Sequence, residues 1–102
     1  MYFVRFTQTA RAELIGAQDW YEGEAPGLGD RFLQAVDAVA ERLSANPLQF
    51  PVVYKNVRRA LLRRFPYSLF FVIEDDTDAV LVIACFHASR DPSQWQKRTR
   101  SS

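Results

Sequence analysis

The sequence predicts an α+β fold in which an antiparallel helical hairpin packs on one face of a small, mostly antiparallel, four-stranded sheet. Two long segments carry apolar residues at helical spacing, and only a few residues separate them. Three apolar runs follow, each bounded by turn residues. A short alternating segment precedes the helices, so the expected order is strand, helix, helix, strand, strand, strand.

The first helix follows residues 2–6, which alternate loosely and are expected to form the N-terminal strand. Thr7 stands at a position suited to a helix N-cap, because its hydroxyl can accept a backbone N–H that has no partner within the helix. The apolar residues that recur at helical spacing are Ala10, Leu14, Ala17 and Tyr21. We expect this helix to end near Gly23.

The second helix follows a connector over residues 23–27. Its apolar stripe, widened by Ala35, consists of Leu28, Phe32, Val36, Val39 and Leu43. Asn46 should end the helix, because Pro47 forces the residue before it out of the α region. With so short a connection, the two helices should pack in antiparallel orientation.

The remaining strands are expected in the second half of the chain. Residues 48–56 have the character of a connector with some extended structure, and two apolar runs, 57–64 and 69–73, flank the turn at Phe65-Pro66-Tyr67. An acidic turn over residues 74–78 leads to the last strand, residues 79–86. The four carboxylates of that turn favour a solvated hairpin turn over a metal site, because acidic turns are common.

The last two strands are apolar at both odd and even positions, so both of their faces should be covered. The helical hairpin can cover only one face. The segment around Trp95 can cover part of the other face, and a bound partner chain could cover more. The alternative is a twisted sheet that curls over itself.

The net charge of +1 hides an asymmetry between the two halves of the chain. Residues 1–44 contain four basic and seven acidic side chains, whereas residues 45–102 contain nine basic and five acidic ones. The basic candidates for binding are Arg58, Arg59, Arg63 and Arg64 on the first apolar run, and His87 and Arg90 after the last strand. Such a set can clamp a phosphodiester, hold the carboxylates of an acidic partner, or form a solvated cationic edge.

Several classes of protein are disfavoured by composition. Cys85 is the single cysteine, so it forms no intramolecular disulfide, and its apolar strand indicates a buried filler. One cysteine and one histidine do not make a zinc site, and there is no glycine-rich phosphate loop, so we expect no metal and no cofactor. Without a signal-peptide pattern or an apolar run of about 20 residues, a cytoplasmic protein is expected. A single domain should cover residues 1–96, followed by a frayed basic tail over residues 97–102.

Seven short motifs appear in an order that resembles a known family. They are Phe6-Thr7, Asp19-Trp20-Tyr21-Glu22, Pro26-Gly27-Leu28-Gly29-Asp30-Arg31-Phe32, Asn46-Pro47, Val57-Arg58-Arg59, Leu62-Arg63-Arg64-Phe65-Pro66-Tyr67 and His87-Ala88-Ser89-Arg90-Asp91-Pro92-Ser93-Gln94-Trp95. Over residues 3–95 the chain resembles the RelE/ParE superfamily of bacterial type II toxin–antitoxin toxins, on its ParE-like side. The resemblance implies a growth-inhibiting toxin that is wrapped and neutralised by the acidic, amphipathic C-terminal segment of a cognate antitoxin, and that meets operator DNA only through this antitoxin.

The resemblance implies two alternative targets. ParE-like members are similar to inhibitors that bind DNA gyrase, whereas RelE-like members are ribosome-dependent mRNA endoribonucleases. The candidates for a nuclease are Arg59, Arg63, His87 and Arg90, and His87 is the only side chain whose ordinary pKa lies near neutrality. Trp95 stands roughly where the nucleases have a tyrosine, and its indole N–H cannot serve as an acid or base.

We therefore favour gyrase binding as the activity that the resemblance implies, with an inactive protein that only binds its antitoxin as a third alternative. The residues expected to contact the target or the antitoxin are Arg58, Arg59, Arg63, Arg64, His87, Arg90 and Trp95.

Overall fold

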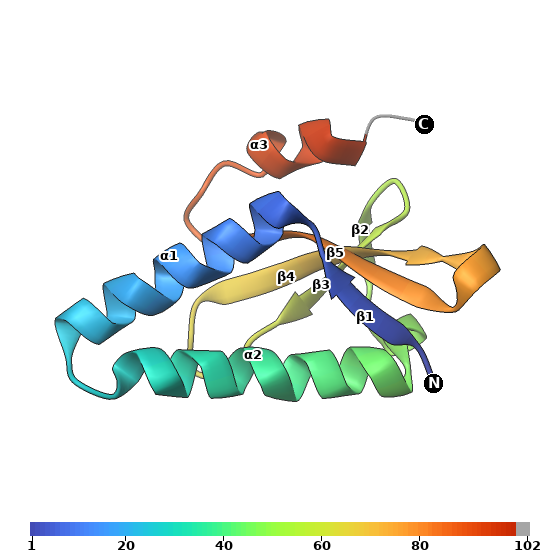
Figure 1. Cartoon of the computed structure of the whole chain (residues 1–102). Helices are drawn as coiled ribbons and strands as arrows, with labels where there is room; N and C mark the ends of the chain where they lie inside the picture. The colour runs from blue at the N-terminus through green and yellow to red at the C-terminus, as the bar shows by residue number, and fades with distance from the viewer. Residues whose placement is uncertain (100–102) are drawn as a thin grey trace.

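The computed structural model describes residues 1–99 of the chain as a five-stranded sheet between two unequal helical layers (Figure 1). The elements are β1 (Phe3–Phe6), α1 (Gln8–Glu24), α2 (Leu28–Ala45), η1 (Pro47–Gln49), β2 (Val52–Tyr54), β3 (Val57–Leu61), β4 (Tyr67–Glu74), η2 (Asp75–Thr77), β5 (Ala79–His87), α3 (Ser93–Gln96) and η3 (Lys97–Thr99). The strand order is β1-β5-β4-β3-β2, with β1 parallel to β5 and the other neighbours antiparallel. The predicted α+β class is confirmed, with one strand more than expected.

The additional strand is β2, which lies in the segment predicted as a connector. It has three residues, of which Val52 and Val53 are exposed, and it pairs with β3 in an irregular register. A strand that is this short and this exposed has no alternation of apolar and polar residues by which to identify it.

The strand that carries the arginines is shorter than predicted, and it does not lie at the middle of the sheet. β3 ends at Leu61 and is second from the edge. Arg63 and Arg64 therefore belong to the loop between β3 and β4. The loop turns the chain back because the Leu62 N–H bonds the Tyr67 carbonyl at 2.9 Å, while Arg64 adopts a left-handed conformation with φ of 68°.

Both long helices begin and end close to the predicted residues. Thr7 caps α1 as expected, since its hydroxyl oxygen accepts the Ala10 N–H at 3.0 Å. α2 has Gly27 at its N-cap and so lacks a capping side chain of its own. The Glu22 carboxylate of α1 takes that role, accepting the N–H groups of Gly27 at 3.0 Å and Gly29 at 2.9 Å.

The larger core lies between the helical hairpin and the sheet, and it contains most of the predicted helical stripes. Its buried helical residues are Ala10, Ala17, Phe32, Val36, Val39 and Leu43, and its buried strand residues include Leu69, Phe71, Val80, Val82 and Cys85. Phe32 is fully buried, and the rings of Tyr21, Phe65 and Tyr67 lie 5.2–5.3 Å from it. This aromatic cluster fixes the hairpin on the sheet.

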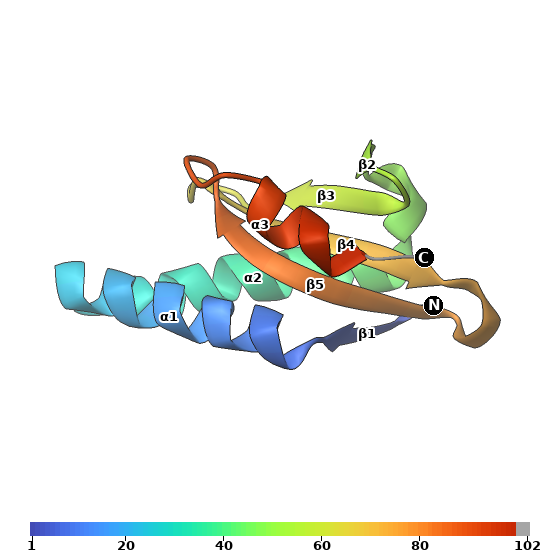
Figure 2. The same ribbon diagram turned by 90° about the horizontal axis from the view of Figure 1, so that it is seen from above.

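The opposite face of the sheet is covered by the C-terminal segment of the chain itself (Figures 1 and 2). Trp95 of α3 is only 3% exposed and stacks on Phe70, with ring centroids 4.2 Å apart. The rest of this smaller core consists of Val57, Ile83, Ala84 and Phe86. The prediction that both faces need covering is confirmed, and the cover over Phe70 is the chain's own tail rather than a partner.

The chain continues past α3 in an ordered turn. We expected a frayed tail from residue 97 onward, but Lys97–Thr99 forms a turn of 3-10 helix, and the remainder of that tail, residues 100–102, lies outside the described residues. The Arg98 guanidinium donates to both carboxylate oxygens of Glu13 on α1, at 2.8 and 3.1 Å, and to the Ile83 carbonyl at 2.8 Å. This ion pair connects the tail to the helical hairpin.

The described residues, 1–99, contain no helix with the length and apolar content that a membrane crossing requires. Within the same range, no three metal-ligating side chains gather in one place.

Candidate functional site

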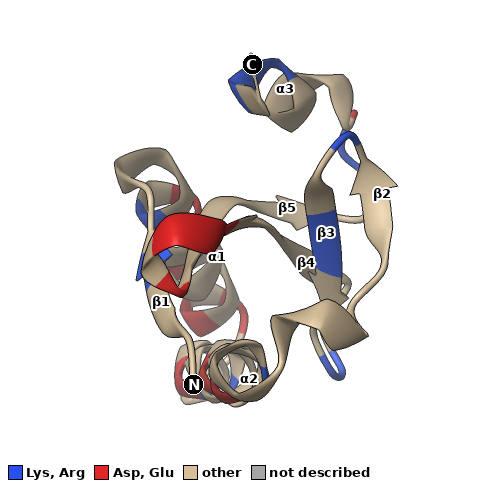
Figure 3. Ribbon diagram, turned by 90° about the vertical axis from the view of Figure 1, so that its right-hand side faces the viewer, with Lys and Arg blue, Asp and Glu red and all other residues tan. Residues whose placement is uncertain are grey.

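The structure separates the predicted site residues into four groups instead of assembling them in one place. Arg58 bonds backbone carbonyls of the segment before β2, Arg63 and Arg64 line a groove beside α2, and His87 lies at the end of β5. Arg59, Arg90 and Trp95 lie on the face of the sheet that α3 covers. In Figure 3 the basic stretch of β3 and the acidic turn after β4 lie apart, on the right and on the left of the view.

Arg58 has a structural role. Its guanidinium donates to the Phe50 carbonyl at 2.6 Å and to the Leu48 carbonyl at 3.4 Å. These contacts hold the segment before β2 against β3. Both bonds come from one nitrogen of the guanidinium, which leaves its other N–H groups for a partner, so the binding role of Arg58 stays a prediction.

Arg59 and Leu61 form an exposed pair on β3, facing the α3 side of the sheet. Arg59 is in register with Phe70, and Leu61 is in register with Ser68. Leu61 is 58% exposed, although it is a large apolar side chain. An exposed leucine two residues from a guanidinium is suited to contact with another protein.

Arg90 completes this surface from the turn after β5. Its guanidinium lies over the Phe86 ring, 4.0 Å from the centroid, and donates to the Gln94 side chain at 2.7 Å. Phe86 is in register with Ser68, which in turn is in register with Leu61. Leu61, Ser68 and Phe86 therefore form one row across β3, β4 and β5, with Leu61 at one end and Arg90 over Phe86 at the other. We call Arg59, Leu61 and Arg90 the outer-face patch.

His87 faces away from this patch. Its ring packs edge-on against Tyr67, with centroids 5.1 Å apart, and Tyr67 belongs to the core under the helical hairpin. The His87 Nδ1 accepts hydrogen bonds from the Ser89 N–H at 3.0 Å and from the Ser89 hydroxyl at 2.8 Å. These bonds favour the tautomer with its proton on Nε2.

Among the described residues near the sheet, burial raises the pKa of one cysteine and of two tyrosines further above neutrality. Burial, assisted by the Glu13 carboxylate, raises the pKa of Cys85 to about 12, so the thiol stays protonated, as expected for a buried filler. Burial also raises the pKa of Tyr21 and of Tyr67, and for Tyr67 the positive charge of Arg90 only partly opposes this shift. The acidic residue next to the outer-face patch is Asp91, which follows Arg90; hydrogen bonds from Ser93 lower the pKa of its carboxyl, so it stays ionised at neutral pH.

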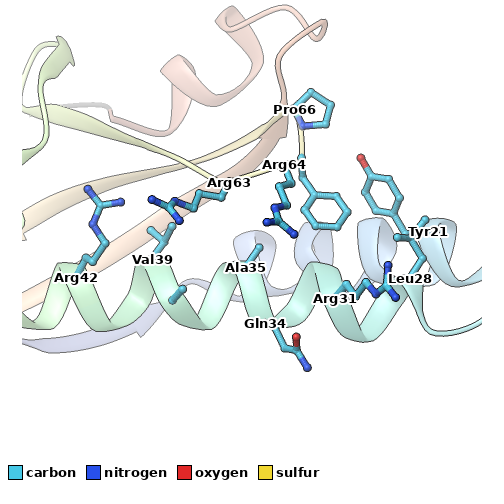
Figure 4. Close-up of a pocket in the computed structure, with 12 residues that line it drawn as sticks. Tyr21, Leu28, Arg31, Gln34, Ala35, Val39, Arg42, Arg63, Arg64 and Pro66 are labelled. Carbon is cyan, nitrogen blue, oxygen red and sulfur yellow. The ribbon is translucent and has the colours of Figure 1, made fainter.

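Arg63 and Arg64 contribute to a groove with a volume of about 1030 Å³ (Figure 4). The groove runs between α2 and the loop from β3 to β4. Two further arginines, Arg31 and Arg42, come from α2 and face the same groove. Four guanidinium groups thus surround a surface that is partly apolar.

The sequence interpretation missed Arg31 and Arg42, although a helical signal for them exists. Arg31, Ala35, Ala38 and Arg42 are spaced by four, three and four residues, which places them in one row along α2. This row lies next to the buried row that contains Phe32 and Val39. Because two small residues lie between two arginines, this row forms a shallow, basic strip beside the core.

Comparison with known families connects this fold to a described group. A family model described as the ParE toxin of the type II toxin–antitoxin system, parDE, matches residues 4–92, which is most of the chain. No protein with a curated description matches the sequence significantly.

Solved structures give a consistent result. One match is in the RelBE2 toxin–antitoxin complex from Mycobacterium tuberculosis, with 32% identity over 84% of this chain and 96% of that chain and a TM-score of 0.59. A second is in the chromosomal ParDE TA system from P. aeruginosa, with 23% identity, 87% and 98% coverage and a TM-score of 0.60. A third is in the intact E. coli RelBE toxin–antitoxin complex, with 17% identity, 88% and 100% coverage and a TM-score of 0.61. The last two show a likeness of fold.

Proposed function

The chain belongs to the ParE toxin family of type II toxin–antitoxin systems, and from this premise we propose that it inhibits growth by binding DNA gyrase until a cognate antitoxin neutralises it. Its membership in the RelE/ParE superfamily, expected from the sequence, is confirmed. Binding of a target and of an antitoxin in the cytoplasm, with operator DNA reached only through the antitoxin, is the function that suits the chemistry of the surface best.

The observation that carries this proposal is the separation of His87 from the outer-face patch. Cleavage of RNA would need an acid and a base on either side of the phosphodiester that the arginines hold. Arg59 and Arg90 lie on the α3 face, whereas the His87 ring packs on Tyr67 at the opposite face. Trp95, at the position expected to carry a tyrosine in a nuclease, is buried against Phe70. This arrangement supports binding without catalysis.

The outer-face patch is the part of the surface that we assign to the target. It combines two guanidinium groups with an exposed leucine, and arginines and large apolar residues make strong contributions at protein interfaces. The Arg59 guanidinium has no hydrogen bond or ion pair with any other described residue, so its charge is available to a carboxylate of the target.

The test is a supercoiling assay with purified gyrase. Wild-type protein is expected to inhibit, and a double variant, Arg59→Ala with Leu61→Ser, should need a concentration about tenfold higher or more. Both positions are exposed, so the fold should survive. Arg11→Ala, an exposed arginine on α1, is the matched control and should inhibit like wild type.

A wild-type protein that leaves supercoiling unchanged over a wide range of concentrations would overturn the proposal. Mapping of transcript ends after induction addresses the nuclease alternative in the same cells. New cleavage sites that appear only in the presence of ribosomes would show that the activity is RNA cleavage and not gyrase binding.

A further inference from the structure

A second groove lies within the helical hairpin, between α1 and α2. The two helices are joined at one end and diverge toward β1 (Figure 1), and the groove between them has a volume of about 300 Å³. We call it the hairpin groove, to distinguish it from the groove that Arg63 and Arg64 line. Most of its lining is apolar and consists of Phe6, Leu14, Ile15, Leu33, Val36 and Ala40.

The hairpin groove uses a different flank of α2 from the arginine-lined groove. Leu33, Asp37 and Ala40 follow one another by four and three residues, so they form one row along the helix. At about 3.6 residues per turn, this row lies about 100° around the helix from the buried Phe32, whereas the row that contains Arg31 lies about 100° in the other direction. An occupant of the hairpin groove therefore leaves the arginines of α2 uncovered.

The α1 side of the hairpin groove exposes a large apolar side chain. Arg11, Ile15 and Gln18 repeat the spacing of four and three residues and line the groove from this side. Ile15 is 48% exposed, whereas Leu14 and Leu33 are partly buried. An exposed isoleucine beside an apolar groove favours contact with another apolar surface, because that contact removes both from water.

The hairpin groove also contains one cation and one anion. Arg11 and Asp37 both line it, and both are exposed. Neither belongs to an ion pair of residues 1–99, since those pairs join Arg5 to Glu74 and Arg98 to Glu13. A partner that fits this groove therefore presents apolar side chains, an anion for Arg11 and a cation for Asp37.

We propose that two copies of this chain bind each other through the hairpin groove, around a two-fold axis. In a two-fold contact, when a residue of one copy touches a given residue of the partner, the reverse contact forms as well. An axis that passes between Arg11 and Asp37 therefore creates two ion pairs, each between Arg11 of one copy and the partner's Asp37. The second copy supplies the anion and the cation in the required number, because it carries the same two side chains.

The neighbouring side chains agree with a reversible contact. Ile15 lies one turn from Arg11 in the same row, so pairing of Arg11 with the partner's Asp37 brings Ile15 against the partner's groove. Glu41, one turn from Asp37, offers the partner's Arg11 a second acceptor. Other carboxylates lie nearer the joined end of the hairpin and repel those of the partner, so we expect a dimer that dissociates on dilution. These carboxylates are Asp19, Glu22, Glu24 and Asp30.

The dimer does not cover the surface that is assigned to the target. The outer-face patch lies on the α3 side of the sheet, opposite the hairpin, so it stays accessible on both copies. Loss of the dimer should therefore leave the inhibition of gyrase unchanged, and Arg11→Ala remains a suitable control in that assay. The inference does not depend on the proposed function, because it concerns another surface and is measured without a target.

The test is sedimentation velocity of the purified protein, whose chain mass is 11.8 kDa, at concentrations from about 1 to 1,000 µM. The mass of the wild type should rise toward that of two chains. Arg11→Asp and Asp37→Arg should each weaken dimerisation about tenfold or more, because each places like charges at both contacts. Lys55→Asp, a charge reversal in the turn between β2 and β3, is the matched control and should dimerise like the wild type.

A mixture of the two groove variants gives the decisive measurement. One copy with Arg11→Asp and one copy with Asp37→Arg carry opposite charges at both contacts of a mixed dimer. The mixture should therefore dimerise about as tightly as the wild type, although neither variant does so alone. An effect of either substitution on folding cannot produce this recovery. If a charge reversal disturbs the circular dichroism spectrum, Arg11→Gln and Asp37→Asn replace it and should weaken the dimer by a smaller factor.

Other results would overturn the inference. A wild-type protein that stays monomeric over the whole range has no such contact. A dimer that both groove variants form as well as the wild type uses another surface, and a mixture of variants that stays monomeric rules out the two-fold pairing of Arg11 with Asp37. If the wild type stays monomeric but binds an amphipathic helical peptide of about 15 leucines and lysines, and Asp37→Arg abolishes that binding, the occupant is a basic helix and not a second copy.

Discussion

The two faces of the sheet are covered by very different amounts of structure. One face carries α1 and α2, with 17 and 18 residues, and a core that includes the fully buried Phe32. The other face carries α3, which has four residues, and depends on Trp95 stacked over Phe70. The first face is held by two long helices, whereas the second is held by Trp95 and by a few side-chain contacts of Arg90 and Arg98.

Because of this difference, we expect one face to govern the stability of the fold and the other to open independently. Cooperative unfolding should be governed by the helical hairpin, because most of the buried apolar surface lies there. The C-terminal segment should open on its own at a lower free energy, since only a few contacts hold it. Three predictions test this contrast, and they are described in order of decreasing effect.

The largest effects are expected from removing the central aromatic residue of each face. Phe32→Ala should lower the free energy of unfolding by about 4 kcal/mol, because it leaves a cavity among three other rings. Trp95→Ala should cost about 3 kcal/mol, at the low end for an aromatic deletion, because water can reach the vacated face. Urea unfolding measures both values.

Hydrogen exchange and dye binding distinguish the two variants further. Trp95→Ala should bind a hydrophobic dye under native conditions, because it uncovers Phe70 and Phe86, and it should retain amide protection in α2. Trp20→Ala is the matched control, since Trp20 is 58% exposed, and should change stability by less than about 0.5 kcal/mol. Equal loss of protection in α2 and α3 on Trp95→Ala would show that the faces are not separable.

The sequence predicted the first face more completely than the second for a physical reason. Two amphipathic helices encode their buried sides in a repeating pattern, so residues such as Phe32 and Val36 could be identified before the structure. A four-residue helix has no periodicity, and Trp95 could only be suggested as partial cover. The requirement for cover followed from the apolar strands, but the completeness of that cover depends on tertiary contacts.

The candidate site was less predictable than the fold. The sequence identified a set of basic residues in the second half of the chain. It did not give the direction of their side chains, because that direction depends on where each strand ends. β3 ends at Leu61, so Arg63 and Arg64 turn toward α2, whereas Arg59 faces α3. The partners of Arg63 and Arg64 in the groove, Arg31 and Arg42, lie more than 20 residues away in the chain, where local patterns give no pairing.

The second prediction concerns the ion pair between Arg98 and Glu13, which connects the C-terminal segment to the helical hairpin. The Glu13 side chain is 15% exposed and the Arg98 side chain 26%. Glu13 also accepts the Cys85 N–H at 3.1 Å, and Arg98 bonds the carbonyl of Ile83, the extra residue at the bulge between β4 and β5. Arg98→Ala should therefore cost about 1–2 kcal/mol, between the values for exposed and for buried pairs.

A double-mutant cycle with Glu13→Gln gives the coupling between the two side chains, and the two losses should not add. The exposed pair of Arg5 with Glu74, whose side chains are 52% and 36% exposed, is the internal control and should contribute less than about 1 kcal/mol. Additive losses for Glu13 and Arg98 would mean that the two side chains stabilise the fold independently and not as an ion pair.

The smallest predicted effect concerns pH and the first face only. Hydrogen bonds from the N–H groups of Gly27 and Gly29 hold the pKa of Glu22 below its ordinary value of 4.5, and a slight desolvation opposes them. A carboxyl whose pKa is lower in the folded state stabilises the fold above the pKa of the unfolded state, and this contribution is lost as the pH falls through the folded value. Glu22→Gln should thus be less stable than wild type at pH 7, and the difference should shrink below about pH 4.5.

Urea unfolding at pH 7 and pH 3 measures this difference in stability. Glu24→Gln is the control, because no hydrogen bond of the described chain uses that exposed carboxylate. A difference that persists unchanged at pH 3 would show that Glu22 acts through packing, whereas one that disappears assigns the N-terminus of α2, and with it the closure of the hairpin, to the charge of Glu22.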